Sequence, residues 1–335
     1  MISSEKLAPR VTIGITTFDR FELLIETIES IKNQLFSNFK VIIVNDNPAR
    51  TLNLHSLGVE NDIRFTIINQ PSNLGEIRTL NLLMSFAETQ YFTWLSDDDL
   101  FHPLFLQVAI NELDSHQEVS AFYSSYFSGE NYNSEDFNCE QNLAVHTFDK
   151  YKFLEHYSAR LIQLIGSYGV FRLETLKAIG GIHKLGTGFS PYSDTLIPIL
   201  ISIKGKILFS NAKFVFFRNH QLSLSNSSKD LESYTSAQKE FLILITPLLK
   251  DFTISSKNKI FTNFFTWFST DRAAITRRNS HFITPLLNQF QQDVRFLLNL
   301  NISFLSKLVI ILSLCPRLTL SARTLLKSRF TRTSL

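Results

Sequence analysis

Tyr91-Phe92-Thr93-Trp94-Leu95-Ser96-Asp97-Asp98-Asp99 joins an apolar, β-prone run to three consecutive carboxylates. No Lys or Arg lies between Glu88 and Pro103, so relief of the repulsion among these carboxylates needs a cation from elsewhere. Hard cations such as Mg²⁺ and Mn²⁺ bind carboxylate and phosphate oxygens. The stretch therefore predicts a strand whose end holds a metal-bound diphosphate. The alternative is an acidic turn that caps a helix beginning near residues 102–103.

Similar apolar runs precede this strand and alternate with helical patterns. Residues 11–18 are β-branched and apolar, and residues 21–35 place apolar side chains at helical spacing. Residues 39–44 and 64–69 form two more strand-like runs, and a further helix is expected near residues 77–87. This order predicts an α/β fold with an open, mainly parallel sheet and flanking helices.

The ends of the predicted parallel strands carry the polar residues of interest. Ligands of such sheets bind at the carboxyl ends of the strands, which here hold residues 16–18, Asp46 and the three aspartates. No glycine-rich phosphate motif is present, so metal and side chains would have to neutralise a bound phosphate. Asp46 could instead be a turn residue before Pro48.

A second candidate carboxylate lies in the later part of the chain. Asp194 is the only acidic residue between Glu174 and Asp230, and it precedes a helix-like apolar run at residues 196–203. It could act as a general base, or it could cap that helix. Residues 206–209 and 214–217 predict a pair of strands, after which Arg218 and His220 follow. A histidine at this place could be a structural hydrogen-bonding residue or a ligand.

Composition limits the class of protein. The 335 residues are 44% hydrophobic with a net charge of +3, enough for a globular chain of about two domains. The two cysteines show no disulfide or zinc spacing, and the N-terminus lacks the apolar core of a secretory signal. These features predict a cytoplasmic protein.

The C-terminal third predicts helices and a basic tail. Helical patterns cover residues 234–249, 257–276, 285–300 and 303–314, after a polar linker that begins at residue 226. We therefore expect domains at residues 1–225 and 226–335. Residues 294–335 carry seven Lys or Arg and no Asp or Glu, which leaves the rest at 3 − 7 = −4. The tail could bind an anionic membrane at its inner face or pack in a helical bundle; no nucleic-acid motif accompanies it.

These motifs resemble the family 2 inverting glycosyltransferases of the GT-A fold. The resemblance covers about residues 8–225 and rests on four segments: Ile15-Thr16-Thr17-Phe18-Asp19-Arg20, Val44-Asn45-Asp46, Asn73-Leu74-Gly75 with Arg78, and Ser96-Asp97-Asp98-Asp99 with Pro103. It implies a hexosyl transfer from a nucleotide-diphosphate sugar, most simply a UDP-sugar. The acceptor would be a hydroxyl of a glycan or lipid-linked acceptor in cell-surface polysaccharide synthesis.

The resemblance also implies roles for individual residues. The catalytic base would be Asp194, preceded here by Ser193 where family members often carry Glu. Arg78 could equally be an exposed helix charge, and a non-catalytic sugar-nucleotide or glycan-binding protein of the same fold is the alternative function. The remaining implied roles are nucleotide binding by Thr16, Phe18, Asp46, Arg78 and Asp97, diphosphate binding by Arg218 and His220, and Mg²⁺ or Mn²⁺ binding by Asp98, Asp99 and His220.

Overall fold

The structure is a computed structural model that describes residues 8–133, 143–220, 230–279 and 284–300, together with Lys307 and Ile311. The described chain divides into two compact units. The first comprises residues 1–153, 162–183 and 193–221, and the second comprises residues 154–161, 184–192 and 222–335. The domain boundary predicted after residue 225 lies outside the described residues.

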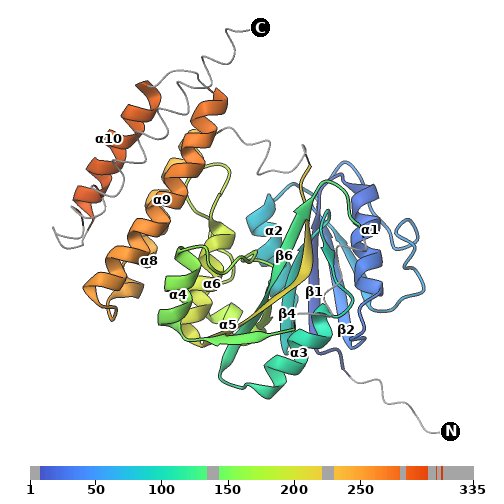
Figure 1. Cartoon of the computed structure of the whole chain (residues 1–335). Helices are drawn as coiled ribbons and strands as arrows, with labels where there is room; N and C mark the ends of the chain where they lie inside the picture. The colour runs from blue at the N-terminus through green and yellow to red at the C-terminus, as the bar shows by residue number, and fades with distance from the viewer. Residues whose placement is uncertain are drawn as a thin grey trace. The chain divides into compact units, whose positions relative to one another are not determined.

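A nine-stranded mixed sheet forms the centre of the first unit (Figure 1). Its order is β3-β2-β1-β4-β8-β6-β9-β5, with β7 paired to β9. Strands β1, β2, β3 and β4 are mutually parallel, as the sequence predicts. The strands are β1 (Val11–Thr17), β2 (Phe39–Asn45), β3 (Phe65–Asn69), β4 (Tyr91–Ser96), β5 (Leu100–Phe101), β6 (Val119–Gly129), β7 (Val145–Phe148), β8 (Val170–Arg172) and β9 (Lys206–Arg218).

Helices cover both faces of the parallel strands, which explains their uninterrupted apolar sequences. On one face, Ile13 and Ile15 of β1 belong to the same core as Leu24 and Ile28 of α1 (Phe21–Lys32). On the other face, a side chain at Gly14 would meet Leu83 of α2 (Glu76–Ser85). The remaining helices of the first unit are α3 (Phe105–Ser115), α5 (Leu173–Ala178) and α6 (Ser193–Lys204), and α4 (Lys150–Ser158) begins there and continues into the second unit.

One strand prediction was wrong. Residues 206–218 form the single strand β9 rather than a strand pair. The register between β6 and β9 shifts at three places, and two of these, between Ser124 and Ser125 and between Ser125 and Tyr126, lie opposite residues 210–215 of β9. A local irregularity of this kind lets one strand keep its pairing through a polar interruption that looks like a turn in the sequence.

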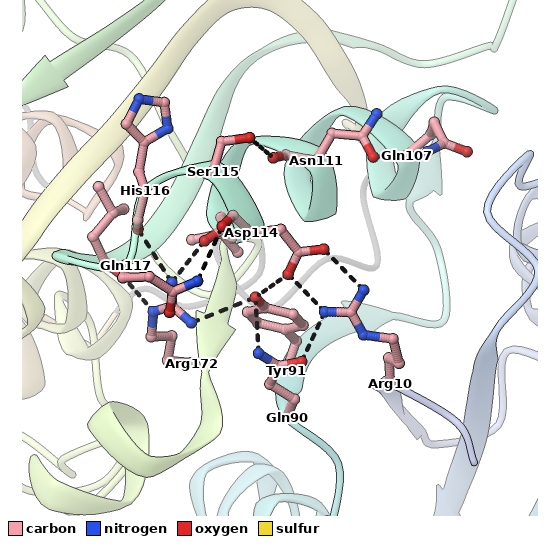
Figure 2. A network of polar contacts seen from close by, with 12 residues as sticks. Arg10, Gln90, Tyr91, Gln107, Asn111, Asp114, Ser115, His116, Gln117 and Arg172 are labelled. Carbon is pink, nitrogen blue, oxygen red and sulfur yellow. Dashed lines mark hydrogen bonds and ion pairs between the residues drawn. The ribbon is translucent and has the colours of Figure 1, made fainter. Parts of the chain in front are cut away.

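A polar network secures the amino ends of β1 and β4 (Figure 2). Arg10, just before β1, binds both carboxylate oxygens of Asp114 at 2.8 and 2.6 Å, and Tyr91 Oη donates to the same carboxylate at 2.7 Å. The buried Arg172 donates to the main-chain oxygens of Val119 and Leu113, both at 2.7 Å. These contacts lie at the amino ends of the strands, away from the polar residues that follow their carboxyl ends.

The second unit is helical in the described residues. It contains α8 (Leu231–Ile245), the 3-10 turn η2 (Pro247–Leu249), α9 (Ile254–Asn279) and α10 (Thr284–Asn299) (Figure 1). Arg272 and Asp293, both buried, form an ion pair of 2.6 Å between α9 and α10. These helices confirm the predicted helical C-terminal region. The helix predicted over residues 303–314 lies outside the described residues apart from two isolated positions.

Candidate active site

The carboxyl end of β2 is fixed by Asp46. Its two carboxylate oxygens accept from the backbone N–H groups of Leu74 and Gly75, at 2.8 and 2.9 Å. Gly75 has φ +81°, a conformation that L side chains rarely adopt, and α2 begins directly after it. Asp46 thus ties the strand end to the loop before α2, and a carboxylate retains lone pairs for a further donor.

Each of the three aspartates after β4 contacts a different set of partners. Asp97 accepts from the backbone N–H of Phe18 at 3.3 Å and lies 2.7 Å from Arg20 Nη2. Asp98 Oδ2 lies 2.5 Å from Arg20 Nη1 and 2.9 Å from His220 Nε2. Asp97 and Asp98 therefore share one guanidinium group.

Asp99 is turned into the protein. The Tyr168 hydroxyl donates to Asp99 Oδ2, and the backbone N–H of Arg218 donates to Oδ1 at 2.7 Å. Burial and the charge of Asp98 raise the pKa of Asp99 well above its ordinary value. Since both of its oxygens already accept protein hydrogen bonds, the geometry favours Asp98 over Asp99 as a metal ligand.

The guanidinium of Arg218 contacts other groups of the protein. Its Nε donates to the Asp98 main-chain oxygen at 2.9 Å, and its Nη2 lies 2.5 Å from Glu26 of α1. The side chain is 9% exposed. These contacts link β9, α1 and the acidic loop, so Arg218 holds the loop in place in this structure. His220, by contrast, lies directly against Asp98.

Asp194 lies in the first turn of α6 and is exposed to solvent. Its Oδ1 accepts from the backbone N–H of Thr195 at 2.8 Å. Desolvation by the surrounding protein raises the pKa of the Asp194 carboxyl group. Asp194 is inside the helix rather than at the position before it, which argues against a purely capping role.

Glu76, at the start of α2, is a site residue that the sequence analysis missed. Its pKa is raised to about 7, mainly by desolvation and also by the charges of Asp194 and Asp98, while Arg20 acts in the opposite direction. Glu76 is also exposed to solvent. The interaction links Asp194 electrostatically to the acidic end of β4, although the two are almost a hundred residues apart in sequence.

Three other predicted residues lie at or near this edge. Thr16 is half-buried at the end of β1, paired with Ser96 of β4. Phe18 follows it with 47% of its surface exposed, so its ring is accessible to a planar ligand. Arg78 lies on α2 with an exposed side chain. Arg20 is a further site residue that the sequence does not reveal, because its ionic contacts with Asp97 and Asp98 join residues far apart in the chain.

The donor set suits a divalent cation only in part. Within the described residues, no three His, Cys, Asp or Glu side chains are grouped so that they could hold a metal. Asp98 and His220 offer one oxygen and one nitrogen at the same place. A hard cation needs more oxygen ligands, and a diphosphate provides them. The residues thus fit a cation that is held jointly with a substrate diphosphate.

The mainly parallel sheet with acidic residues at the carboxyl ends of its strands is the arrangement of the GT-A fold. The sequence profile of glycosyl transferase family 2 matches residues 12–172, just under half of the chain. An uncharacterized glycosyltransferase of Methanocaldococcus jannaschii is 29% identical over 164 residues, 48% of this chain and 56% of the relative. WcaA of Escherichia coli, a glycosyl transferase named for colanic acid biosynthesis, is 33% identical over 101 residues, 30% of this chain and 36% of the relative. The matched part thus spans only about a third to a half of these relatives.

Solved structures confirm the fold. TarS of S. aureus in complex with UDP-GlcNAc has a TM-score of 0.52 at 13% identity, covering 80% of this chain and 83% of that one. The mannosyltransferase PcManGT of Pyrobaculum calidifontis, in complex with GDP-Man and Mn²⁺, has a TM-score of 0.53 at 16% identity, covering 95% and 87%. At these identities the likeness concerns the fold.

Proposed function

We propose that the protein transfers a sugar, with inversion, from a UDP-sugar to a hydroxyl of a glycan or lipid-linked acceptor in cell-surface polysaccharide synthesis. The observation that carries this proposal is the acidic end of β4, where Asp97 and Asp98 share the guanidinium of Arg20 and Asp98 contacts His220. The charges of Asp194 and Asp98 both raise the pKa of Glu76, which supports Asp194 as the candidate base. The UDP-GlcNAc bound to TarS and the naming of WcaA support the donor and pathway classes.

In this proposal Asp194 removes the proton from the acceptor hydroxyl as that oxygen attacks the anomeric carbon. Its raised pKa suits this role, because a base is most effective when its pKa approaches the working pH. Asp97 would hold the ribose, and Thr16, Phe18, Asp46 and Arg78 would surround the base and phosphates. Arg218 would act on the diphosphate by fixing the acidic loop.

A Mg²⁺ or Mn²⁺ ion, when bound, would neutralise the leaving diphosphate. Asp98 and His220 are the residues that would hold it, with Asp99 supporting the loop behind them. The Mn²⁺ in the PcManGT complex supports a divalent cation.

We also propose that the protein works in the cytoplasm and associates peripherally with the inner face of the membrane through its basic tail. No helix within the described residues is long and apolar enough to cross a bilayer. The tail beyond residue 300 lies largely outside those residues, so the proposal rests on its charge.

Nucleotide titration is the direct test. UDP, GDP and TDP would be titrated into the full chain with and without Mn²⁺, and a panel of UDP-sugars would then be screened for donor hydrolysis. We expect metal-dependent binding of UDP and hydrolysis of one donor. Failure of all three nucleotides to bind would refute the enzyme proposal, whereas binding without hydrolysis or transfer would favour a non-catalytic sugar-nucleotide-binding protein.

A further inference from the structure

Arg20 occupies the position where a cation would neutralise the acidic strand end. Its guanidinium lies 2.7 Å from Asp97 Oδ1 and 2.5 Å from Asp98 Oδ2. The Asp97 side chain is fully buried, Asp98 is 9% exposed and Arg20 is 24% exposed. The guanidinium nitrogen of Arg20 that contacts Asp97 is thus held inside the protein, while solvent reaches part of the Arg20 side chain.

The backbone before Arg20 explains how the side chain reaches this place. Asp19 has φ +59°, a left-handed conformation that aspartate tolerates better than most residues. This turn ends the extended β1 segment and makes Arg20 the residue that precedes α1. The short connection between β1 and α1 therefore directs a guanidinium toward the end of β4.

A guanidinium stays protonated at all relevant pH values. Burial alone would lower the pKa of Arg20, but the charges of Asp97 and Asp98 outweigh burial and raise it. A free divalent cation approaching Asp98 would meet this fixed positive charge at the carboxylate that it needs.

Resting on the proposed function, we propose that Arg20 is an internal counter-ion that excludes free divalent metal and passes from Asp98 to the donor diphosphate when metal and nucleotide bind together. Arg and phosphate form the same two-pronged hydrogen bonds as Arg and carboxylate, so the fork exchanges one oxyanion for another. Asp98 Oδ2 would then be available to hold a cation, for which the diphosphate would supply further oxygen ligands. Arg20 can keep its contact with Asp97 throughout.

The test measures binding rather than activity. Mn²⁺ alone would be titrated into the full-length chain, followed by electron paramagnetic resonance, for wild type, Arg20→Gln and Arg64→Gln. Arg64 is a matched control, because it pairs with Asp62 at 2.6 Å beside the amino end of β3. We expect Arg20→Gln to bind free Mn²⁺ about 10-fold more tightly than wild type, the usual value of one charged hydrogen bond, and Arg64→Gln to match wild type. Equal Mn²⁺ affinities of wild type and Arg20→Gln would overturn the exclusion of metal.

A second variant separates charge from geometry. Arg20→Lys keeps the positive charge without the fork, so it should exclude free Mn²⁺ as wild type does but bind UDP in the presence of Mn²⁺ about 10-fold more weakly. Unchanged UDP affinity in Arg20→Lys would overturn the transfer to diphosphate. If wild type binds no nucleoside diphosphate at all, the proposed function fails, and that outcome also overturns the transfer. The titrations with Mn²⁺ alone still decide whether Arg20 excludes metal.

Discussion

Gly166 lies so close to the candidate base that any side chain there should displace it. A Cβ built at residue 166 would stand 1.8 Å from the main-chain oxygen of Asp194 and 2.6 Å from its carbonyl carbon, whereas real Cβ atoms essentially never come within 3.0 Å of another group. The Tyr123 hydroxyl, from β6, donates to the Gly166 oxygen at 3.2 Å and holds the other side of the glycine. In Gly166→Ala, Asp194 or residue 166 must therefore shift by at least 3.0 − 1.8 = 1.2 Å.

A displacement of about 1 Å at a reacting group can cost on the order of 10²-fold in rate. We expect Gly166→Ala to lower kcat for donor hydrolysis by about that factor and to leave the Kd for UDP and Mn²⁺ unchanged, because the nucleotide residues lie on other elements. Steady-state kinetics and calorimetric titration would measure the two quantities. Gly129→Ala is the control, since its nearest neighbours would be 3.5 and 3.6 Å from the new Cβ. Unchanged kcat in a folded Gly166→Ala variant, or an equal loss of nucleotide affinity, would refute the reasoning.

Four further predictions follow from the site and the second unit. Asp194→Asn should lower kcat by about 10² to 10⁴ with near-normal UDP affinity, measured by the same kinetics, and near-normal turnover would remove Asp194 from the mechanism. Tyr168→Phe should cost about 1–3 kcal/mol in urea unfolding, because the buried Asp99 loses a donor, whereas the exposed Tyr132→Phe should change little. Desolvation raises the pKa of Asp271 from 3.8 to about 6, so its ionisation destabilises the fold: this cost is absent below about pH 4 and grows as pH rises to about 6. Thermal unfolding measured at several pH values should show that, between about pH 4 and pH 6, the free energy of unfolding of wild type falls by about 2 kcal/mol relative to that of Asp271→Asn. The same pH dependence of stability in both proteins would contradict this prediction. The full chain should sediment with anionic but not neutral vesicles at low salt, and a version ending at residue 302 should bind less, whereas equal, negligible binding of both would exclude the membrane role.

The parallel half of the sheet and its acidic edge could be predicted from sequence because both depend on local patterns. Continuous apolar runs such as residues 39–44 indicate strands covered on both faces, and Asp46 and residues 97–99 follow such runs directly. The topology of a parallel sheet then places the carboxyl ends of these strands at the same edge.

Contacts between distant residues could not be predicted in the same way. The ion pairs of Arg20 with Asp97 and Asp98 join residues nearly eighty positions apart, and the close approach of Gly166 to Asp194 depends on the packing of α6. Glu76 likewise acquires its neighbours only when α2 is placed on the sheet. Sequence spacing contains none of these distances, so the site residues found by pattern were those on strand ends.

The interleaved course of the chain has a consequence for how the protein can be divided. The chain passes between the two compact units after Phe153, Leu161, His183, Tyr192 and Gln221. Within the second unit, Asn263 of α9 lies 3.3 Å from Ser158 Oγ, and Ser236 of α8 lies 3.1 Å from the backbone N–H of Thr187.

Removing the helices after residue 221 would strip residues 154–161 and 184–192 of these partners, and the second of those segments leads directly into Ser193 and Asp194. The C-terminal helices therefore cannot be removed without loss of contacts to these two inner segments. Chimaeras that exchange them for the equivalent part of another protein of the same fold would have to exchange both inner segments as well. A single breakpoint that keeps these contacts would have to lie before residue 154.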